Sequence, residues 1–144
     1  GIGFVKDVKG QYDVIIIDSS DPIGPAVGLF SQDFYKNVFE ALKDEGLFTA
    51  QTESPFFNRD LIKKVYSAVS EIFPITRLYL SNVPTYPSGL WSFTMGSKRH
   101  DTLAAQLDRP YQVVTRYYTP EVHKAAFVLP RFVEGILSDA SGRG

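Results

Sequence analysis

Two aspartates, Asp18 and Asp21, are the residues of this sequence whose types and spacing most clearly suggest chemistry. They follow the apolar run of residues 14–17, and Pro22 and Pro25 come soon after them. Prolines disfavour a regular helix here, so the two carboxylates are expected to lie in a stiff loop. Such a pair can form an acidic turn, bind a metal ion, hold an organic cation or act as a base.

The sequence offers little support for a metal ion at this pair. A metal site needs further ligands, yet residues 22–32 contain no His, Asp or Glu. His100 and His123 are far along the chain, where we expect a loop and a surface helix. We therefore predict no metal. The cation and base hypotheses are compatible, because a protonated amine attracted to Asp18 can also give up its proton there.

Four strands are expected to position these residues. Short apolar runs predict strands at residues 12–18, 47–51 and 75–82, the first of them a central strand buried on both faces. A fourth strand is predicted at residues 90–96. It follows the third across a loop too short for a crossover helix, so it should run antiparallel.

Helices are expected between and after these strands. Amphipathic patterns and capping residues predict four of them: one beginning at Ser31 and stopping at Gly46, one beginning at Asn58 and ended by Pro74, one beginning at Thr119-Pro120, and one beginning at Pro130. Strand–helix–strand units of this kind have right-handed crossovers. The order of elements therefore predicts a sheet in which the strands joined by helices are parallel.

Together these elements predict an α/β fold, namely the C-terminal half of a methyltransferase-like, Rossmann-type doubly wound sheet that is mostly parallel with one antiparallel strand. We assign residues 1–138 to this domain and expect residues 139–144 to form a disordered tail. The Gly-rich strand-to-helix turn that holds a nucleotide-like cofactor in such folds is absent from the sequence. We therefore expect the chain to be a C-terminal portion.

Other polar side chains are expected at the same edge of the sheet as the aspartates. Ligands of open α/β sheets bind at the carboxyl ends of the strands, and Gln51 ends the second predicted strand. Tyr86 lies in the Pro/Gly-rich loop before the strand that carries Trp91. A tyrosine in such a loop often serves packing alone. Two carboxylates, an amide and a phenol beside aromatic rings nevertheless suit a flexible aliphatic cation.

The bulk composition is that of an ordinary globular domain. The chain has 144 residues, a formal net charge of −1 and no cysteine. It carries no basic stripe of the kind that nucleic acids require, and no apolar run approaches the length of a membrane helix. The lack of cysteine fits a cytoplasmic protein. We therefore predict small-molecule ligands and neither a nucleic-acid nor a membrane partner.

Four segments resemble those of the polyamine aminopropyltransferases, and of spermidine synthases in particular. They read YDVIIIDSSDPIGPAVGLF, GLFTAQTES, VPTYPSGLWSFTMGSK and RYYTPEVHKAAFVLPRFV, within a similarity that runs over residues 1–137. The resemblance implies transfer of the aminopropyl group of decarboxylated S-adenosylmethionine to putrescine, giving spermidine and methylthioadenosine. It implies no cofactor or metal beyond this co-substrate.

The resemblance also implies roles for particular residues. Asp18 matches the proton acceptor of the family, and the residues assigned to substrate binding are Asp21, Ser19, Ser20, Gln51 and Tyr86. Pro25 matches a proline that packs beside the methylthioadenosine moiety, and Gly1 adjoins the position of an acidic residue that contacts the adenine. The Gly-rich co-substrate loop of the family is not in this sequence, so we expect the chain alone to be inactive.

Several alternatives stay open. The acceptor can be another amine, such as agmatine, cadaverine or spermidine. The same half-sheet also serves class I methyltransferases, although these have no evident use for an acidic pair beside a PTYPSG loop. A third alternative is an inactive fragment that serves only in assembly. The resemblance further implies a cytoplasmic homodimer or homotetramer.

Overall fold

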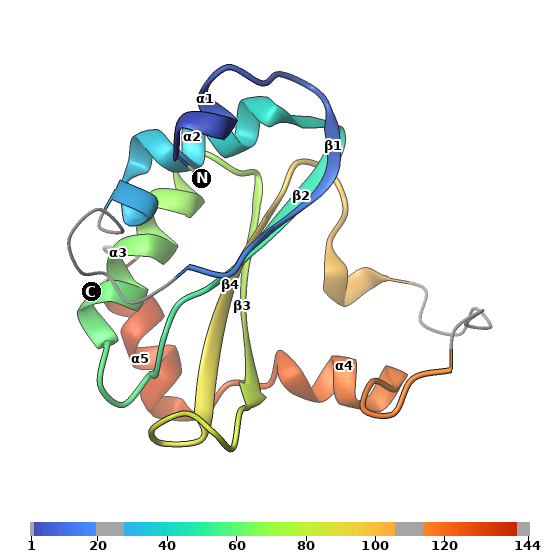
Figure 1. Ribbon diagram of the computed structural model, residues 1–144. Coiled ribbons are helices and arrows are strands. Elements are labelled where there is room, and N and C mark those ends of the chain that lie inside the picture. The colour runs from blue at the N-terminus through green and yellow to red at the C-terminus, as the bar shows by residue number, and fades with distance from the viewer. Residues whose placement is uncertain (1, 20–27, 106–113, 141–144) are drawn as a thin grey trace.

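A computed structural model describes residues 2–19, 28–105 and 114–140 of the chain. Its centre is one four-stranded sheet with strand order β1-β2-β4-β3 (Figure 1). The strands are β1 (Tyr12–Ile17), β2 (Leu42–Gln51), β3 (Ile75–Asn82) and β4 (Leu90–Ser97). The helices are α1 (Ile2–Lys6), α2 (Gln32–Ala41), α3 (Arg59–Ser70), α4 (Pro120–Ala126) and α5 (Arg131–Ala140), with a 3-10 turn, η2, at Thr102–Ala104.

The strand directions confirm the predicted fold class. β1 and β2 pair in parallel, whereas β4 lies between β2 and β3 and runs antiparallel to both of them. Three strands therefore point one way and one points the other. The carboxyl ends of β1, β2 and β3 consequently meet at one edge of the sheet, the lower edge in Figure 1, together with the loop that joins β3 to β4.

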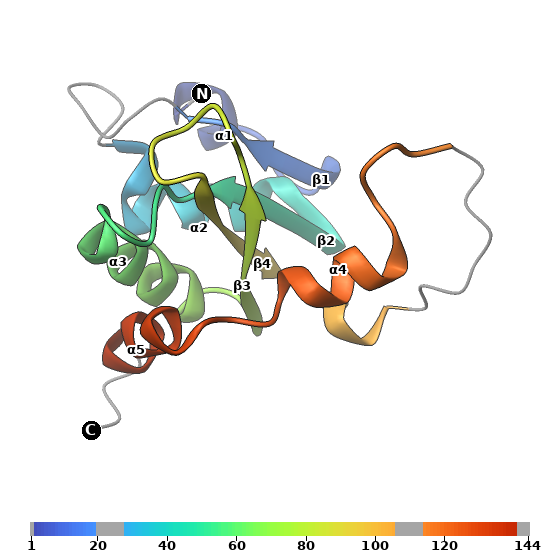
Figure 2. The same cartoon turned by 90° about the horizontal axis from the view of Figure 1, so that it is seen from below.

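Helices cover the two faces of the sheet unequally. Figure 1 shows α1, α2, α3 and α5 on one side and α4 on the other, and Figure 2 shows α3 and α5 side by side. Ring contacts fill the well-covered side: the centroid of Phe73 lies 4.9 Å from that of Phe48 and 5.0 Å from that of Phe39. Tyr35 packs against Phe48 in the same cluster, where burial raises the pKa of its phenol.

A clamp between two segments fixes the outer strand of the sheet. Arg77 on β3 donates two hydrogen bonds to Asp101, one from Nε to Oδ1 at 3.2 Å and one from Nη2 to Oδ2 at 2.5 Å. Paired bonds of this kind are stronger than single contacts. They hold the pKa of the Asp101 carboxyl below its usual value, and they tie the segment after β4 back to β3.

The prediction that β1 is a central strand buried on both faces is wrong for this chain. β1 is an edge strand, and the side chains of Val14 and Ile16 are 52% and 75% exposed. Among the described residues no strand pairs with the outer edge of β1. The apolar run therefore creates an uncovered apolar surface here.

The predicted boundary between the first long helix and the second strand is also wrong. α2 ends at Ala41, and β2 begins at Leu42 instead of residue 47. Leu42 is extended and only 1% exposed. It pairs with Tyr12 of β1, and the sheet register shifts between this pair and Val14–Leu47. Gly46 consequently lies inside the strand, at this irregularity, and does not end the helix.

The other predicted elements lie close to the observed ones. The third strand has the predicted bounds, and the caps at Ser31 and Thr119 each accept a hydrogen bond from a backbone N–H three residues later. Asn58 precedes α3 but makes no side-chain capping bond. None of the helices in the described ranges is long and apolar enough to cross a membrane.

Candidate functional site

The first site residues stand directly after β1. Asp18 follows the last residue of the strand and is exposed, whereas Ser19 is only 9% exposed. The side chain of Asp18 is thus free to meet a ligand at the carboxyl edge of the sheet. Four predicted site residues, Gly1, Ser20, Asp21 and Pro25, lie outside the described residues.

Gln51 connects the end of β1 to β4. Its Nε2 donates to the backbone carbonyl of Ser19 and, at 3.2 Å, to Oε1 of Glu53. Its Oε1 accepts a hydrogen bond from Nε1 of Trp91 at 2.6 Å. The amide therefore holds the backbone of Ser19 near Trp91, at the beginning of β4.

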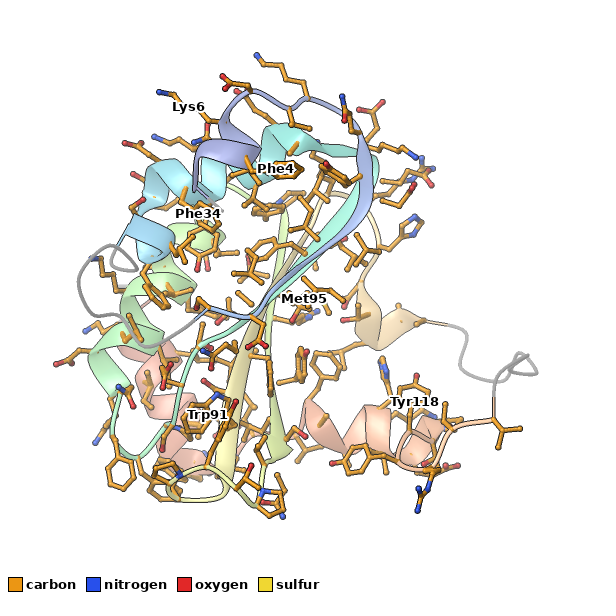
Figure 3. All side chains as sticks on the ribbon, in the orientation of Figure 1. Phe4, Lys6, Phe34, Trp91, Met95 and Tyr118 are labelled. Atoms are coloured by element: carbon orange, nitrogen blue, oxygen red, sulfur yellow. The ribbon has the colours of Figure 1, made fainter. Side chains whose placement is uncertain are left out.

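Trp91 in turn supports the ring of Tyr86. The two ring centroids lie 4.6 Å apart, and Trp91 is 8% exposed whereas Tyr86 is 45% exposed. Figure 3 shows Trp91 beside the loop that joins β3 to β4. The phenol of Tyr86 is accordingly held by a buried indole while one side of it stays open to solvent.

Short backbone bonds shape the Tyr86 loop. The N–H of Val83 donates to the carbonyl of Gly89 at 2.6 Å, and the N–H of Tyr86 donates to that of Val83 at 3.0 Å. Ser88 and Gly89 both have positive φ, 71° and 69°. The Ser88 hydroxyl contacts that of Ser54 at 2.7 Å, so this loop is anchored to the segment that follows Gln51.

Glu53 also contacts Gln51, although no role was predicted for it from the sequence. Glu53 is 4% exposed and has a φ of 71°, a backbone conformation that is uncommon for a residue other than glycine. Its carboxylate accepts from Gln51, and its backbone carbonyl accepts from the N–H and the hydroxyl of Ser92. The only signal in the sequence was a carboxylate two residues beyond the end of a buried strand.

The structure thus joins several predicted site residues into one series of contacts. Ser19, Gln51, Trp91 and Tyr86 are linked in that order, with Asp18 next to Ser19. Two of these groups can accept a further hydrogen bond: the exposed carboxylate of Asp18 and Oε1 of Gln51, which receives one bond from Trp91. Such an arrangement suits a ligand that carries hydrogen-bond donors and positive charge.

The two histidines lie in other contacts. Nε2 of His100 is 3.3 Å from Oε2 of Glu45. The ring of His123 meets the Tyr118 hydroxyl and the Thr102 carbonyl, each at 3.0 Å. In the part of the chain that the structure describes, no three His, Cys, Asp or Glu residues gather as metal ligands would.

Two apolar hollows flank the sheet. One, of about 590 Å³, lies between β3 and α4 and is lined by Tyr79, Met95 and Phe127 among others. The other, of about 390 Å³, is lined by residues of β1 together with Phe4 and Phe34 and also by Asp18 and Ser19. Figure 3 labels Phe4 and Phe34. The second hollow therefore adjoins the candidate site, along the unpaired edge of β1.

Comparison with known proteins shows which family the chain resembles. Residues 1–106 match the model of the spermine/spermidine synthase domain. The polyamine aminopropyltransferase of Caldicellulosiruptor bescii is 62% identical over 137 residues, which cover 95% of this chain and 49% of the relative. That of Shouchella clausii is 53% identical over 137 residues, 95% of this chain and 50% of the relative. The chain thus spans about half the length of these relatives.

Solved structures give the same result. A crystal structure of spermidine synthase in complex with the transition state analogue AdoDATO matches with a TM-score of 0.85 and 41% identity, over 95% of this chain and 48% of that one. The spermidine synthase of Thermotoga maritima matches with a TM-score of 0.83 and 41% identity, over 95% of this chain and 47% of that one.

Proposed function

This chain belongs to the spermine/spermidine synthase family, and we propose that it supplies the amine-binding and proton-accepting part of a spermidine synthase. The observation that carries this proposal is the series of contacts from Ser19 through Gln51 and Trp91 to Tyr86, beside Asp18. The complete enzyme, as we use the term, joins this chain to the remaining half found in its relatives.

The proposed reaction moves an aminopropyl group from sulfur to nitrogen. The substrates are decarboxylated S-adenosylmethionine and putrescine. The amine nitrogen forms a bond to the aminopropyl carbon next to the sulfonium, and the carbon–sulfur bond breaks with its electron pair going to sulfur. Methylthioadenosine leaves as a neutral thioether, so the leaving group needs no proton.

Asp18 has the part of proton acceptor in this scheme. Putrescine is protonated near neutral pH, and an ammonium has no lone pair for attack. The exposed carboxylate of Asp18 can bind the ammonium and take its proton as the new bond forms. Because a nearby carboxylate favours the charged form of an amine, we place deprotonation together with attack and not before it.

Other site residues hold the rest of the diamine. The Tyr86 ring, backed by Trp91, offers an apolar surface to the methylene chain and a hydroxyl to a terminal nitrogen. We propose that Asp21, Ser19, Ser20 and Gln51 also contact the amine, and that Gly1 and Pro25 flank the co-substrate. These assignments rest on the family resemblance together with the positions of Ser19 and Gln51 in the contact series.

Putrescine is the acceptor that we propose, with agmatine, cadaverine and spermidine as the alternatives. A class I methyltransferase remains a second candidate only through the shared fold, and none of the site contacts favours it. We further propose that the complete enzyme is a cytoplasmic homodimer or homotetramer without a metal or an additional cofactor.

Thermal unfolding tests the amine site. Putrescine at 100 times its dissociation constant should stabilise the complete enzyme by about 2.7 kcal/mol, whereas 1,4-butanediol, with hydroxyls in place of the amines, should not. Tyr86→Ala should lose most of this stabilisation, because the methylene chain loses the ring, and Tyr86→Phe should keep most of it. Equal stabilisation by the diamine and the diol would contradict an acidic amine site.

A further inference from the structure

The amide of Gln51 has three partners whose hydrogen-bonding character is fixed. The backbone carbonyl of Ser19 and the carboxylate of Glu53 meet the amide through Nε2, whereas the indole N–H of Trp91 meets Oε1. A carbonyl and a carboxylate accept hydrogen bonds, and an indole N–H can only donate one. All three hydrogen bonds would be lost if the amide were turned over, so the partners determine which end is oxygen.

In this orientation the amide can still accept a hydrogen bond, but it cannot donate another. Both protons of Nε2 are engaged by Ser19 and Glu53, and one of the two lone pairs of Oε1 is engaged by Trp91. The remaining lone pair of Oε1 can accept a hydrogen bond. Gln51 is thereby set to receive a donor, such as an ammonium group, and has no proton left for an acceptor.

Glu53 meets Gln51 from an unusual backbone conformation. It lies two residues further along the chain and has a φ of 71°, and its Oε1 lies 3.2 Å from Nε2 of Gln51. Its carbonyl oxygen is held by the N–H of Ser92 at 2.9 Å and by its hydroxyl at 2.8 Å. A left-handed backbone at a non-glycine residue persists only where the surroundings hold it, and such residues cluster at functional sites.

We propose that Glu53 is a positioning residue, whose carboxylate fixes the Gln51 amide so that Oε1 accepts a hydrogen bond from the protonated amine of the substrate. The identity of the substrate rests on the proposed function, whereas the hydrogen bond by which Glu53 orients the Gln51 amide does not. Without an acceptor at position 53, one proton of Nε2 loses its partner. The amide can then rotate and present N–H to the ammonium, which repels it.

Two neutral substitutions of nearly equal length separate the hydrogen bond from the charge. Glu53→Gln keeps an oxygen that can accept from Nε2, and Glu53→Met does not. In the complete enzyme, Glu53→Met should raise the KM for putrescine about tenfold, the effect of losing one hydrogen bond, and leave kcat within a few-fold. Glu53→Gln should stay close to wild type. Thr94→Val, which changes a buried hydroxyl bonded to Thr52 and not to Gln51, is the matched control.

A double-mutant cycle tests whether Glu53 acts through Gln51. In a Gln51→Leu background, Glu53→Met and Glu53→Gln should have the same KM, because no amide remains to be oriented. An additive effect of Glu53→Met in that background would overturn the proposal. Equal rises in KM for Glu53→Met and Glu53→Gln in the wild-type background would also overturn it, since the charge would then act by itself.

The indole N–H of Trp91 reports the same orientation without any enzyme assay. Its nitrogen–proton NMR signal, assigned by loss in Trp91→Phe, should move and exchange faster in Glu53→Met but not in Glu53→Gln. An unchanged signal in a folded Glu53→Met protein would overturn the positioning role. The two proposals can fail separately. If the wild type shows no aminopropyl transfer but the indole signal still changes in Glu53→Met and not in Glu53→Gln, the proposed function is overturned, whereas the orientation of Gln51 by Glu53 is supported.

Discussion

At the scale of single residues, Asp18 has the most demanding part in the proposed reaction. The amine must stay charged long enough to be attracted to the site and must be neutral when the new bond to carbon forms. We propose that the carboxylate of Asp18 at the end of β1 serves both needs, because it can first pair with the ammonium and then accept its proton. The co-substrate makes no comparable demand, since its sulfonium is already an activated leaving group.

Replacing Asp18 by asparagine should therefore slow turnover more than it weakens binding. We expect Asp18→Asn to lower kcat of the complete enzyme by at least about 100-fold, within the range for loss of a general base. Asp13→Asn is a matched control, because Asp13 lies on the same strand and forms an exposed ion pair with Lys43 at 2.7 Å. Steady-state kinetics with saturating amine measures kcat of both variants. A kcat of Asp18→Asn within a few-fold of wild type would rule out Asp18 as the general base.

The residues that could be predicted were those whose position follows from strand ends. The positions of Asp18 and Gln51 follow directly from the rule that parallel strands end at one edge, and the loop of Tyr86 returns to that edge. Glu53 could not be assigned in this way, because it lies beyond the end of the strand, where neither its left-handed backbone nor its contact with Gln51 follows from a spacing pattern. Asp21 and Pro25 lie outside the described residues, and their roles stay predictions.

At the scale of elements, the fit between β4 and the helices depends on a small residue. A Cβ at Gly96 would lie 2.5 Å from Cε1 of Phe48 and 2.7 Å from Cγ of Phe73, closer than such atoms approach. These rings belong to the core cluster that joins β2 to α2 and α3. The two aromatic rings therefore leave room at this position only for glycine.

Two glycine-to-alanine substitutions test this fit. Gly96→Ala should lower the free energy of unfolding by about 1–3 kcal/mol, as overpacking of a core does. Gly135→Ala, in α5, places its Cβ where no atom lies within 4 Å and should raise the free energy of unfolding by about 0.5–1 kcal/mol. Denaturant unfolding compares the two, and a Gly96→Ala protein as stable as wild type would show that the rings can move aside.

Strands and helices were predicted well wherever local pattern decides them. β3 and the starts of α2 and α4 follow from an apolar run or a capping residue close in the sequence. The start of β2 does not, because the polar residues 43–45 resemble the end of a helix. Only pairing with β1, including the register shift after Tyr12, extends the strand back to Leu42.

At the scale of the whole molecule, the uncovered side of β1 is the main departure from the sequence-based expectation. An apolar run is read as a buried strand because burial normally follows from it, yet Val14 and Ile16 are exposed here. Exposed apolar edges of this kind promote association. Because the chain spans about half the length of its relatives, we propose that the complete enzyme covers this side and there binds the co-substrate.

We propose that this site directs an aminopropyl group to a diamine, and product identification tests this proposal most directly. The complete enzyme would be incubated with putrescine and either decarboxylated or ordinary S-adenosylmethionine, and the products would be separated and identified by mass spectrometry. We expect spermidine and an equal amount of methylthioadenosine with the decarboxylated donor, and no methylated amine with the ordinary one. A methylated product, or no aminopropylated product from putrescine, cadaverine, agmatine or spermidine, would contradict it.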